Sequence, residues 1–272
     1  MEVTKILQAN NFEFAKKFGQ NFITDTNLLN AIVEDCNLNK NDEVLEIGTG
    51  AGTLTRAISQ KAKRVVTFEI DNRLKDILKE TLKDCTNVEL NFADIMTINQ
   101  DEIDSKFENG YSLIANLPYY ITTPIIFKFL ESKNLKSLNI MVQKEVAERI
   151  CATSGKDYGI LSIMIDFYGN AKIKRIVKRN MFTPPPNVDS AIVSIEINQK
   201  YDCNKELFSQ IVHKSFAMRR KTLFNNLKQG FNLNKEQLDF LLKDYKQGVR
   251  AEELSTQDFV NLTNLLDKMI ND

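Results

Sequence analysis

Residues 116–119 read Asn-Leu-Pro-Tyr and directly follow the apolar run YSLIA. An amide oxygen and a neighbouring backbone carbonyl, stiffened by proline, can accept two hydrogen bonds from a substrate amino group while the aromatic ring stacks beside it. The same residues could simply end a buried strand, because proline cannot donate to a sheet ladder and asparagine favours turns. The residues that accompany the motif must decide between these readings.

A glycine-rich loop, EIGTGAG at 46–52, follows an apolar run and precedes the helical pattern TLTRAISQKA. Its glycines allow a tight turn and a close approach of the backbone to a ligand. The spacing departs from GxGxxG, which disfavours a dinucleotide. A carboxylate at Glu46 would repel pyrophosphate but favour a cationic ligand, so we interpret the loop as the site of a sulfonium cofactor.

Two further acidic residues follow predicted strands. Glu69 comes about 20 residues after the loop, where an acidic side chain can accept hydrogen bonds from ribose hydroxyls. Asp94, in NFADI, could accept from an adenine amino group. Either one alone could be an ordinary loop residue. Together with the glycine loop they predict a nucleoside pocket at the carboxyl edge of a sheet.

The elements that would position these residues alternate along the chain. Short apolar runs rich in β-branched residues, separated by helical patterns, occur at 43–47, 65–70, 88–92, 112–115 and 138–142. This alternation predicts a doubly wound α/β fold with a mostly parallel sheet. Residues 171–177 and 190–197 are expected to form an antiparallel pair that closes the sheet edge, joined by a proline-rich connection that forms no ladder.

Strand patterns end near residue 203. Three later segments show apolar residues at helical spacing, at 205–216, 235–245 and 257–269. Asn234 and Ser255 each stand three residues ahead of a side chain that can complete a capping box. We therefore expect a ligand-binding domain at 1–200 and a small all-helical domain at 201–272.

Composition narrows the class of protein. The chain has 272 residues with 43% hydrophobic content, enough for a sizeable core. Its four cysteines form no CxxC pair, and with the single histidine, His213, they do not suit a zinc site. We see no signal peptide or membrane span and expect a cytoplasmic protein with reduced thiols and no metal.

Net charge is zero, yet in two windows of the sequence all the charged residues are basic. They comprise Lys172, Lys174, Arg175, Lys178 and Arg179, and then Lys214, Arg219, Arg220, Lys221, Lys228 and Lys235. Exposed charge runs are usually solvated faces, but nucleic acid binds to local patches of this kind. Of these residues, Arg219, Arg220 and Lys221 are our candidates for RNA contacts.

The order EIGTGAG, Glu69, Asp94 and NLPY resembles an S-adenosylmethionine-dependent amino methyltransferase. With FGQNF at 18, QKEVAERI at 143 and FTPPPNVDSAIV at 182, nearly the whole chain is similar to the KsgA family, the bacterial small-subunit ribosomal RNA adenine dimethyltransferases. The resemblance implies a seven-stranded Rossmann-like methyltransferase sheet. It also implies dimethylation of two adjacent adenines in the 3'-terminal hairpin of 16S ribosomal RNA during small-subunit biogenesis.

The resemblance also implies a set of site residues. The cofactor S-adenosyl-L-methionine would contact Asn21, Ile23, Gly48, Glu69, Asp94 and Asn116. In catalysis, the Asn116 oxygen and the Leu117 carbonyl would accept the adenine amino group, with Pro118 stiffening the turn. Tyr119 would stack on one face of the base and Phe182 on the other, whereas Tyr120 is interpreted as packing. Thr49 departs from the proline of many relatives.

Other functions remain open from the residues alone. The ribosomal RNA methyltransferases that confer macrolide resistance share the cofactor motifs. A DNA adenine methyltransferase would carry NPPY, where this chain has Leu117. A non-catalytic RNA-binding relative would have no need for Glu69, Asp94 and Asn116. The expected partner is 16S ribosomal RNA within a 30S subunit or its precursor, bound by a monomer without contact to a membrane.

Overall fold

The computed structural model describes residues 3–10, 12–14 and 19–271. Phe18, the first residue of the FGQNF motif, lies outside them. Two compact units are present: Met1–Ala147 with Lys172–Ile197, and Glu148–Ala171 with Asn198–Asp272. Within the described ranges, no helix has the length and apolar character needed to cross a bilayer.

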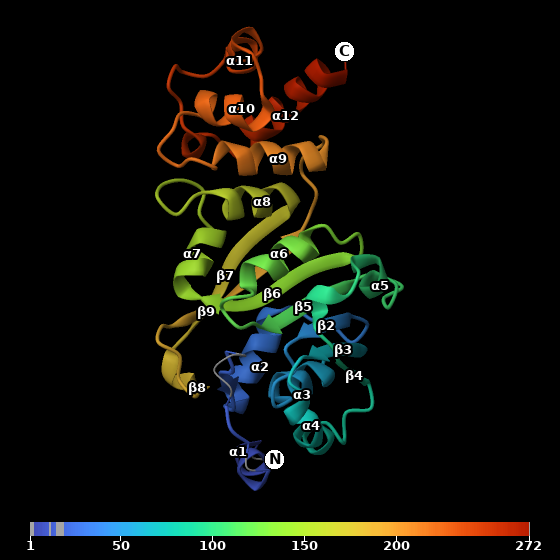
Figure 1. The fold of residues 1–272 in the computed structure, drawn as a ribbon. Coiled ribbons are helices and arrows are strands. Elements are labelled where there is room, and N and C mark those ends of the chain that lie inside the picture. Colours follow the sequence, from blue (N-terminus) through green and yellow to red (C-terminus); the bar gives the residue numbers. More distant parts are fainter. Residues whose placement is uncertain (1–2, 11, 15–18, 272) are drawn as a thin grey trace. The chain divides into compact units, whose positions relative to one another are not determined.

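A seven-stranded sheet runs through the first unit (Figure 1). Its strands are β2 (Glu43–Ile47), β3 (Arg64–Glu69), β4 (Val88–Phe92), β5 (Tyr111–Asn116), β6 (Leu135–Gln143), β7 (Gly169–Val177) and β9 (Ser190–Ile197). They lie in the order β4-β3-β2-β5-β6-β9-β7. The first five pair in parallel and β9 pairs antiparallel to β6. The predicted mostly parallel sheet is confirmed, with β7 and β9 together at one edge.

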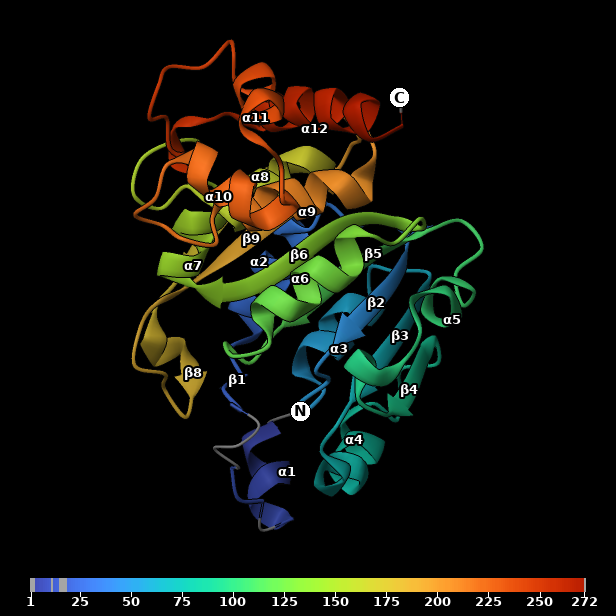
Figure 2. The same ribbon diagram turned by 45° about the horizontal axis from the view of Figure 1, so that its top comes forward.

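Helices cover both faces of this sheet. The helices of the first unit are α1 (Val3–Ala9), α2 (Thr26–Asp35), α3 (Thr53–Ser59), α4 (Lys75–Thr81), α5 (Gln100–Asp104) and α6 (Thr122–Leu130). Helices α2 and α3 pack on one face, where Leu29 and Ile58 join Val44 and Ile114 in a single core cluster. Helix α6 lies on the opposite face (Figure 2). Strands β2 and β5 are therefore covered on both sides, and nearly all of their residues are buried.

The second unit is helical. Its helices are α8 (Ile160–Tyr168), α9 (Lys205–Ser215), α10 (Leu223–Phe231), α11 (Lys235–Leu241) and α12 (Thr256–Asn271), while α7 (Lys144–Ile150) crosses the boundary between units. The Phe167 and Phe208 rings stack with centroids 4.0 Å apart and join α8 to α9. This packing places α8 in the helical unit, whereas the sequence predicted a boundary at residue 200 and left α8 in the first domain. Helix α10 was not predicted.

Both predicted capping boxes are present in the helical unit. The Asn234 side chain accepts from the Gln237 backbone while the Gln237 side chain accepts from the Asn234 backbone. Ser255 and Asp258 make the same reciprocal pair. Each pair satisfies backbone N–H groups that the first helical turn leaves without partners, so these local sequence signals located the starts of α11 and α12.

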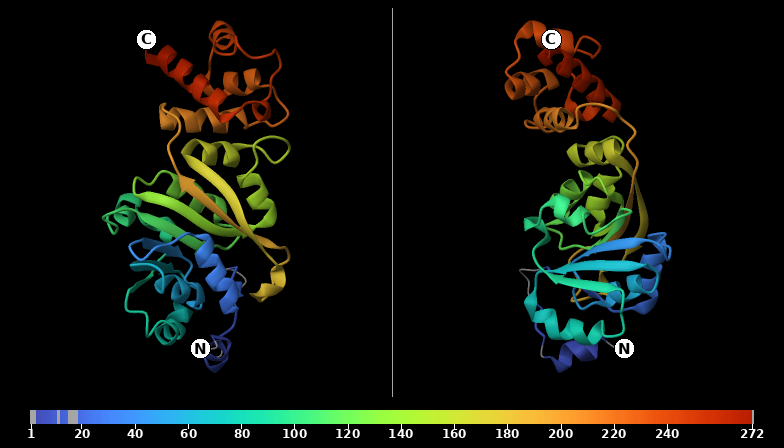
Figure 3. Two further views of the ribbon diagram at one scale, coloured as in Figure 1. Left: turned by 180° about the vertical axis from the view of Figure 1, so that it is seen from behind. Right: turned by 90° about the vertical axis from the view of Figure 1, so that its right-hand side faces the viewer.

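The structure contains a second, two-stranded sheet that the sequence patterns did not predict. Strands β1 (Phe22–Ile23) and β8 (Phe182–Thr183) pair antiparallel, with Ile23 opposite Phe182. In the left-hand view of Figure 3, the gold segment that contains β8 lies next to the blue helix α2. The proline-rich connection was expected to form no ladder, and that expectation is wrong for the two residues before the prolines. Their backbone N–H groups are intact, and only the following prolines lack a donor.

Single-turn 3-10 helices complete the described structure. They lie at Asn72–Leu74, Ile95–Thr97, Arg179–Met181 and Ala251–Glu253. The first two follow β3 and β4 directly, at the carboxyl edge of the sheet. Asp71 and Asp94 accept hydrogen bonds at their first turns, from the backbone N–H groups of Arg73 and Met96.

The buried position of Glu46 contradicts one inference from the sequence. Its side chain is fully buried, and Oε2 accepts a 2.6 Å hydrogen bond from Thr55 on α3, under the glycine loop. Burial raises its pKa to about 8, although hydrogen bonds from Thr55 and Thr67 act in the opposite direction. The sequence suggested an anionic Glu46 facing a cationic ligand. Side chains alternate along a strand, so Ile47 reaches the ligand side and Glu46 the core.

Glu46 should make stability depend on pH. The folded protein holds the Glu46 proton up to pH about 8 while the unfolded chain releases it near the usual pKa of 4.5. The contribution of this group to the free energy of unfolding is therefore fully present below the unfolded-state pKa of 4.5, and it is lost as pH rises toward 8. Relative to Glu46→Gln, the wild-type free energy of unfolding should fall by up to about 1.4 kcal/mol per pH unit across this window.

Urea unfolding of both proteins at a series of pH values measures this difference. Asp76→Asn, which changes an exposed carboxylate on α4, is the matched control and should leave the wild-type slope in place. Parallel curves for wild type and Glu46→Gln would show that the buried carboxyl group does not titrate in this range.

Candidate active site at the carboxyl edge of the sheet

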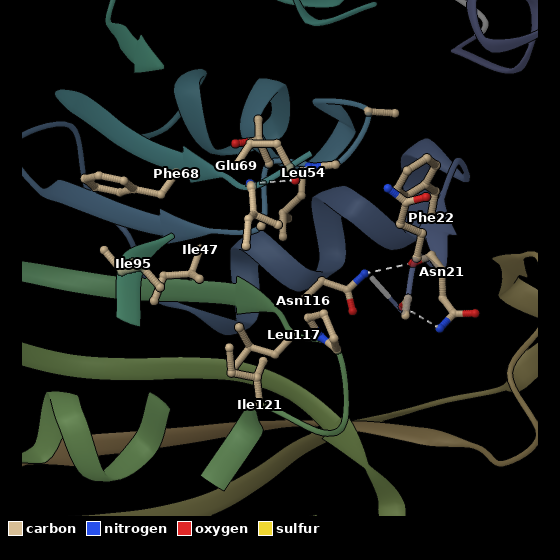
Figure 4. A pocket seen from close by; sticks show the side chains of 18 of the residues that line it. Asn21, Phe22, Ile47, Leu54, Phe68, Glu69, Ile95, Asn116, Leu117 and Ile121 are labelled. Atoms are coloured by element: carbon tan, nitrogen blue, oxygen red, sulfur yellow. Dashed lines mark hydrogen bonds between the residues drawn. The ribbon is translucent and has the colours of Figure 1, made fainter. Parts of the chain in front are cut away.

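A cavity opens at the carboxyl ends of the parallel strands (Figure 4). Five segments supply most of its lining: Gly19–Ile23, the loop after β2 from Ile47 to Leu54, Phe68–Ile70, Ala93–Ile95 and Asn116–Ile121. The chain leaves β2 toward β3 on one side and returns to β5 on the other, so the cavity lies at a topological switch point of the sheet. Ligands bind at such points in open α/β sheets because adjacent loops diverge there.

All six predicted cofactor residues line this cavity. They are Asn21, Ile23, Gly48, Glu69, Asp94 and Asn116. Leu117, Pro118 and Tyr119 line it as well. The candidate catalytic and cofactor residues therefore meet at one place, with the exception of Phe182.

The glycine loop takes a conformation that side chains rarely adopt. Gly48 and Gly50 have φ values of 81° and 55°. A Cβ on Gly50 would lie 3.1 Å from the Phe22 ring. The loop thus requires glycine for its backbone angles at both positions and for its close approach to β1 at Gly50.

Glu69 ties two loops together. Its Oε2 accepts from the Gly50 N–H at 2.8 Å, and its Oε1 accepts from the N–H groups of Ile70 and Asp71 at 2.9 and 2.8 Å. Burial raises the pKa of Glu69, and these three backbone donors act in the opposite direction. A carboxylate offers about four acceptor positions, so one remains on Oε2 for a ligand hydroxyl.

Asp94 keeps one carboxylate oxygen available to a ligand. Its Oδ1 accepts from the Met96 N–H at 2.9 Å at the start of the 3-10 turn. Within the described part of the chain, no donor reaches Oδ2. The side chain is half-buried in the cavity wall, so Oδ2 fits the amino group of a nucleobase.

The Asn116 amide is held in one orientation. Its Nδ2 donates to the Asn21 carbonyl at 3.1 Å, which leaves Oδ1 to accept from a ligand (Figure 4). Thr53 also donates to the Ile23 carbonyl at 2.8 Å. A Cβ on Gly19 would lie 3.0 Å from the Pro118 Cβ. Residues 19–23 are thus fixed against the loops after β2 and β5.

Tyr119 lines the cavity as predicted, whereas Tyr120 and Phe182 do not lie where the sequence placed them. The Tyr119 hydroxyl lies 2.9 Å from Ser190 Oγ, and burial raises the pKa of Tyr119. Tyr120 was interpreted as packing, but it is 66% exposed and lines the cavity. Adjacent residues of a turn point in different directions, so the YY pair could have signalled that the two rings differ in exposure.

Phe182 was predicted to stack on the substrate base. It is 4% exposed, belongs to the core cluster of α2 and α3, and does not line the cavity. Its β8 strand pairs with Ile23, and this pairing turns the ring into the core. The structure thus places Phe182 in the core, its stacking on the substrate base stays a prediction, and Tyr120 is the exposed aromatic at the cavity.

The predicted RNA-binding residues lie in the helical unit, in the connection between α9 and α10. Arg219, Arg220 and Lys221 are exposed. The Arg219 guanidinium donates to the Lys156 carbonyl at 3.1 Å. No described acidic side chain forms a salt bridge with any of the three, so their charge is available to an anionic partner.

The donor and acceptor set of the cavity fits S-adenosylmethionine. Single acceptor positions on Glu69 and Asp94 suit a ribose hydroxyl and an adenine amino group, and the glycine loop allows close backbone approach at Gly48. Apolar side chains of Ile47, Phe68 and Ile95 line the same space and can enclose a flat base.

Comparison with known proteins agrees with this geometry. A family model described as ribosomal RNA adenine dimethylase matches residues 11–268. Ribosomal RNA small subunit methyltransferase A of Clostridioides difficile is 41% identical, over 98% of this chain and 96% of that protein.

Two solved structures share the fold. A dimethyladenosine transferase from Plasmodium falciparum is 28% identical with a TM-score of 0.78, covering 91% of this chain and 98% of that one. The 23S rRNA methyltransferase ErmE is 24% identical with a TM-score of 0.71, covering 91% and 100%. Family model, curated relative and fold together show that the chain belongs to the ribosomal RNA adenine dimethylase family of S-adenosylmethionine-dependent methyltransferases.

Proposed function

We propose that the protein dimethylates the exocyclic amino groups of two adjacent adenines in the 3'-terminal hairpin of 16S ribosomal RNA. The observation that carries this proposal is the Asn116 amide, whose Nδ2 is bound to the Asn21 carbonyl so that Oδ1 is set to accept. The family match and the near-complete coverage of small-subunit methyltransferase A relatives support the choice of substrate.

The amino nitrogen of adenine is a poor nucleophile because its lone pair is delocalised into the ring. Hydrogen bonds from its two N–H groups to the Asn116 oxygen and the Leu117 carbonyl favour a pyramidal nitrogen with a localised lone pair. When bound, S-adenosylmethionine supplies an electrophilic methyl group. Holding the reactants in line provides the proximity contribution, which can reach about 7–11 kcal/mol in well-oriented systems.

Stacking presents the base to these acceptors. Tyr119, held by its contact with Ser190, offers one ring at the cavity. Base-aromatic stacking contributes about 1–3 kcal/mol per base, which offsets the few kcal/mol needed to unstack a nucleotide. No general base is required, because the methylated nitrogen is acidic enough to release its proton to water.

The substrate in the cell is proposed to be an assembling 30S subunit in the cytoplasm, acted on by a monomer. The exposed basic residues 219–221 would bind RNA phosphates in the helical unit, whereas the residues that do the chemistry belong to the first unit. One assay tests the substrate: incorporation of tritiated methyl groups into under-methylated 30S subunits, 50S subunits and DNA. Label confined to 30S subunits supports the proposal, and label in 50S subunits or DNA would show that the proposed substrate is wrong.

Asn116 should control methyl transfer rather than folding. Asn116→Ala removes the acceptor and should lower the single-turnover rate at saturating S-adenosylmethionine by at least about 10²-fold, the scale for losing a preorganised transition-state contact. Asn139→Ala, which removes a buried amide of β6 outside the cavity lining, is the matched control. A near-normal rate for Asn116→Ala in a folded protein would reduce Asn116 to a turn residue.

Glu69 should control cofactor affinity. Glu69→Gln keeps the size of the side chain but removes the charge and places a donor among three backbone N–H groups. Loss of a hydrogen bond to a charged group costs about 1.5–3 kcal/mol, so we expect at least tenfold weaker binding by calorimetry. Glu89→Gln, on β4 in a partly exposed ion pair with Arg64, should bind normally. Equal affinities for the two variants would contradict the role of Glu69.

The basic residues of the helical unit should carry RNA affinity without chemistry. Replacing Arg219, Arg220 and Lys221 with alanine should weaken RNA binding. It should also reduce the slope of log affinity against log salt by about 0.7–0.9 for each lost phosphate contact. Filter binding over a salt series measures both, with alanine at Lys40, Lys61 and Lys63, exposed lysines of the first unit, as the charge-matched control. Identical slopes for the two triple variants would remove this assignment.

A further inference from the structure

A buried carboxylate lies beside the cavity without lining it. Asp71 follows Glu69 by two residues and is 2% exposed. Its oxygens accept from Arg73 Nε and Nη2 at 2.9 and 2.6 Å, a two-pronged pairing, and from Gln20 Nε2 at 2.8 Å. A buried charge is tolerated only when it is paired and hydrogen-bonded, so these contacts account for its position.

Asp71 connects the two sides of the cofactor site. Its side chain binds Gln20, the neighbour of the cavity residue Asn21, whose carbonyl orients Asn116. Its backbone N–H donates to Glu69 Oε1 at 2.8 Å. A displacement of Asp71 would therefore move the segment 19–23 on one side and the Glu69 carboxylate on the other.

Arg73 extends the same set of contacts. Its guanidinium lies 5.3 Å from the centre of the Phe12 ring, and Nη1 donates to the Glu13 carbonyl at 3.3 Å. Burial alone would raise the pKa of Asp71, but the hydrogen bonds from Arg73 and Gln20 outweigh it and hold that pKa below its usual value. Asp71 is thus charged at neutral pH and accepts with both oxygens.

We propose that Asp71 is a positioning residue for the cofactor site, acting through Gln20 on residues 19–23 and through its backbone on Glu69. The inference rests on the proposed function, because it takes Asn21 and Glu69 to contact S-adenosylmethionine. Asp71 itself does not line the cavity. Its effect should appear mainly in cofactor affinity, with a smaller effect on the rate at saturating cofactor because the Asn21 carbonyl orients Asn116.

The test changes which of residues 20 and 71 donates the hydrogen bond between them. Gln20→Ala removes the donor, and Asp71→Asn removes the charge and places an Nδ2 donor opposite either the Gln20 amide or the Arg73 guanidinium. Each should weaken S-adenosylmethionine binding about tenfold by calorimetry, equivalent to about 1.4 kcal/mol. The double variant Gln20→Glu with Asp71→Asn reverses donor and acceptor and should recover most of the affinity, whereas Gln20→Glu alone should bind more weakly than Gln20→Ala.

Further measurements separate positioning from a general loss of structure. Single-turnover rates at saturating cofactor should fall less than cofactor affinity, and RNA affinity should match the wild type, while backbone amides of residues 19–23 should exchange hydrogen faster. Lys79→Ala, which removes an exposed ion pair on α4, is the matched control and should change nothing.

The outcomes distinguish the two proposals. Wild-type affinity in both Gln20→Ala and Asp71→Asn, or failure of the reversed pair to recover binding, would overturn the positioning role of Asp71. If Glu69→Gln also bound S-adenosylmethionine normally, the proposed cofactor site itself would be in error. If Glu69→Gln were the only variant to bind weakly, the proposed cofactor site would stand and only the positioning role of Asp71 would be rejected.

Discussion

A single buried carboxylate sets the shape of the candidate active site. Glu69 accepts backbone N–H groups from Gly50 on one loop and from Ile70 and Asp71 on its own. These contacts join the loops after β2 and β3 at the switch point of the sheet. Because three of its acceptor positions are used by the protein, the remaining one has a defined direction, and a ribose hydroxyl can meet it only in one orientation.

The site is closed by residues far from these loops in sequence. Residues 19–23 are held by Asn116, by Thr53 and by the pairing of β1 with β8. The contact between Asn116 and the Asn21 carbonyl matters most for the proposed chemistry, because it orients the acceptor for the adenine amino group. Cofactor binding and methyl transfer would thus share one hydrogen bond, and a change at either residue should affect both.

Local sequence patterns located most of the elements. The predicted strands at 43–47, 88–92 and 190–197 coincide with β2, β4 and β9, because short segments rich in β-branched and apolar residues between turn residues favour strands. The capping pairs located α11 and α12 for a similar local reason. Helix α10 was missed, and strands β1 and β8, of two residues each, are too short to show any periodicity.

By itself the sequence determined which chemical groups meet at the carboxyl edge, because parallel strands bring successive loops to one edge whatever their exact packing. Only the tertiary structure decided where individual side chains point. Glu46 and Ile47 are neighbours on one strand, yet one is buried under α3 and the other lines the cavity. Phe182 is turned into the core by its pairing with Ile23, and Tyr120 is left exposed. Burial and orientation depend on contacts between distant segments, which no local pattern encodes.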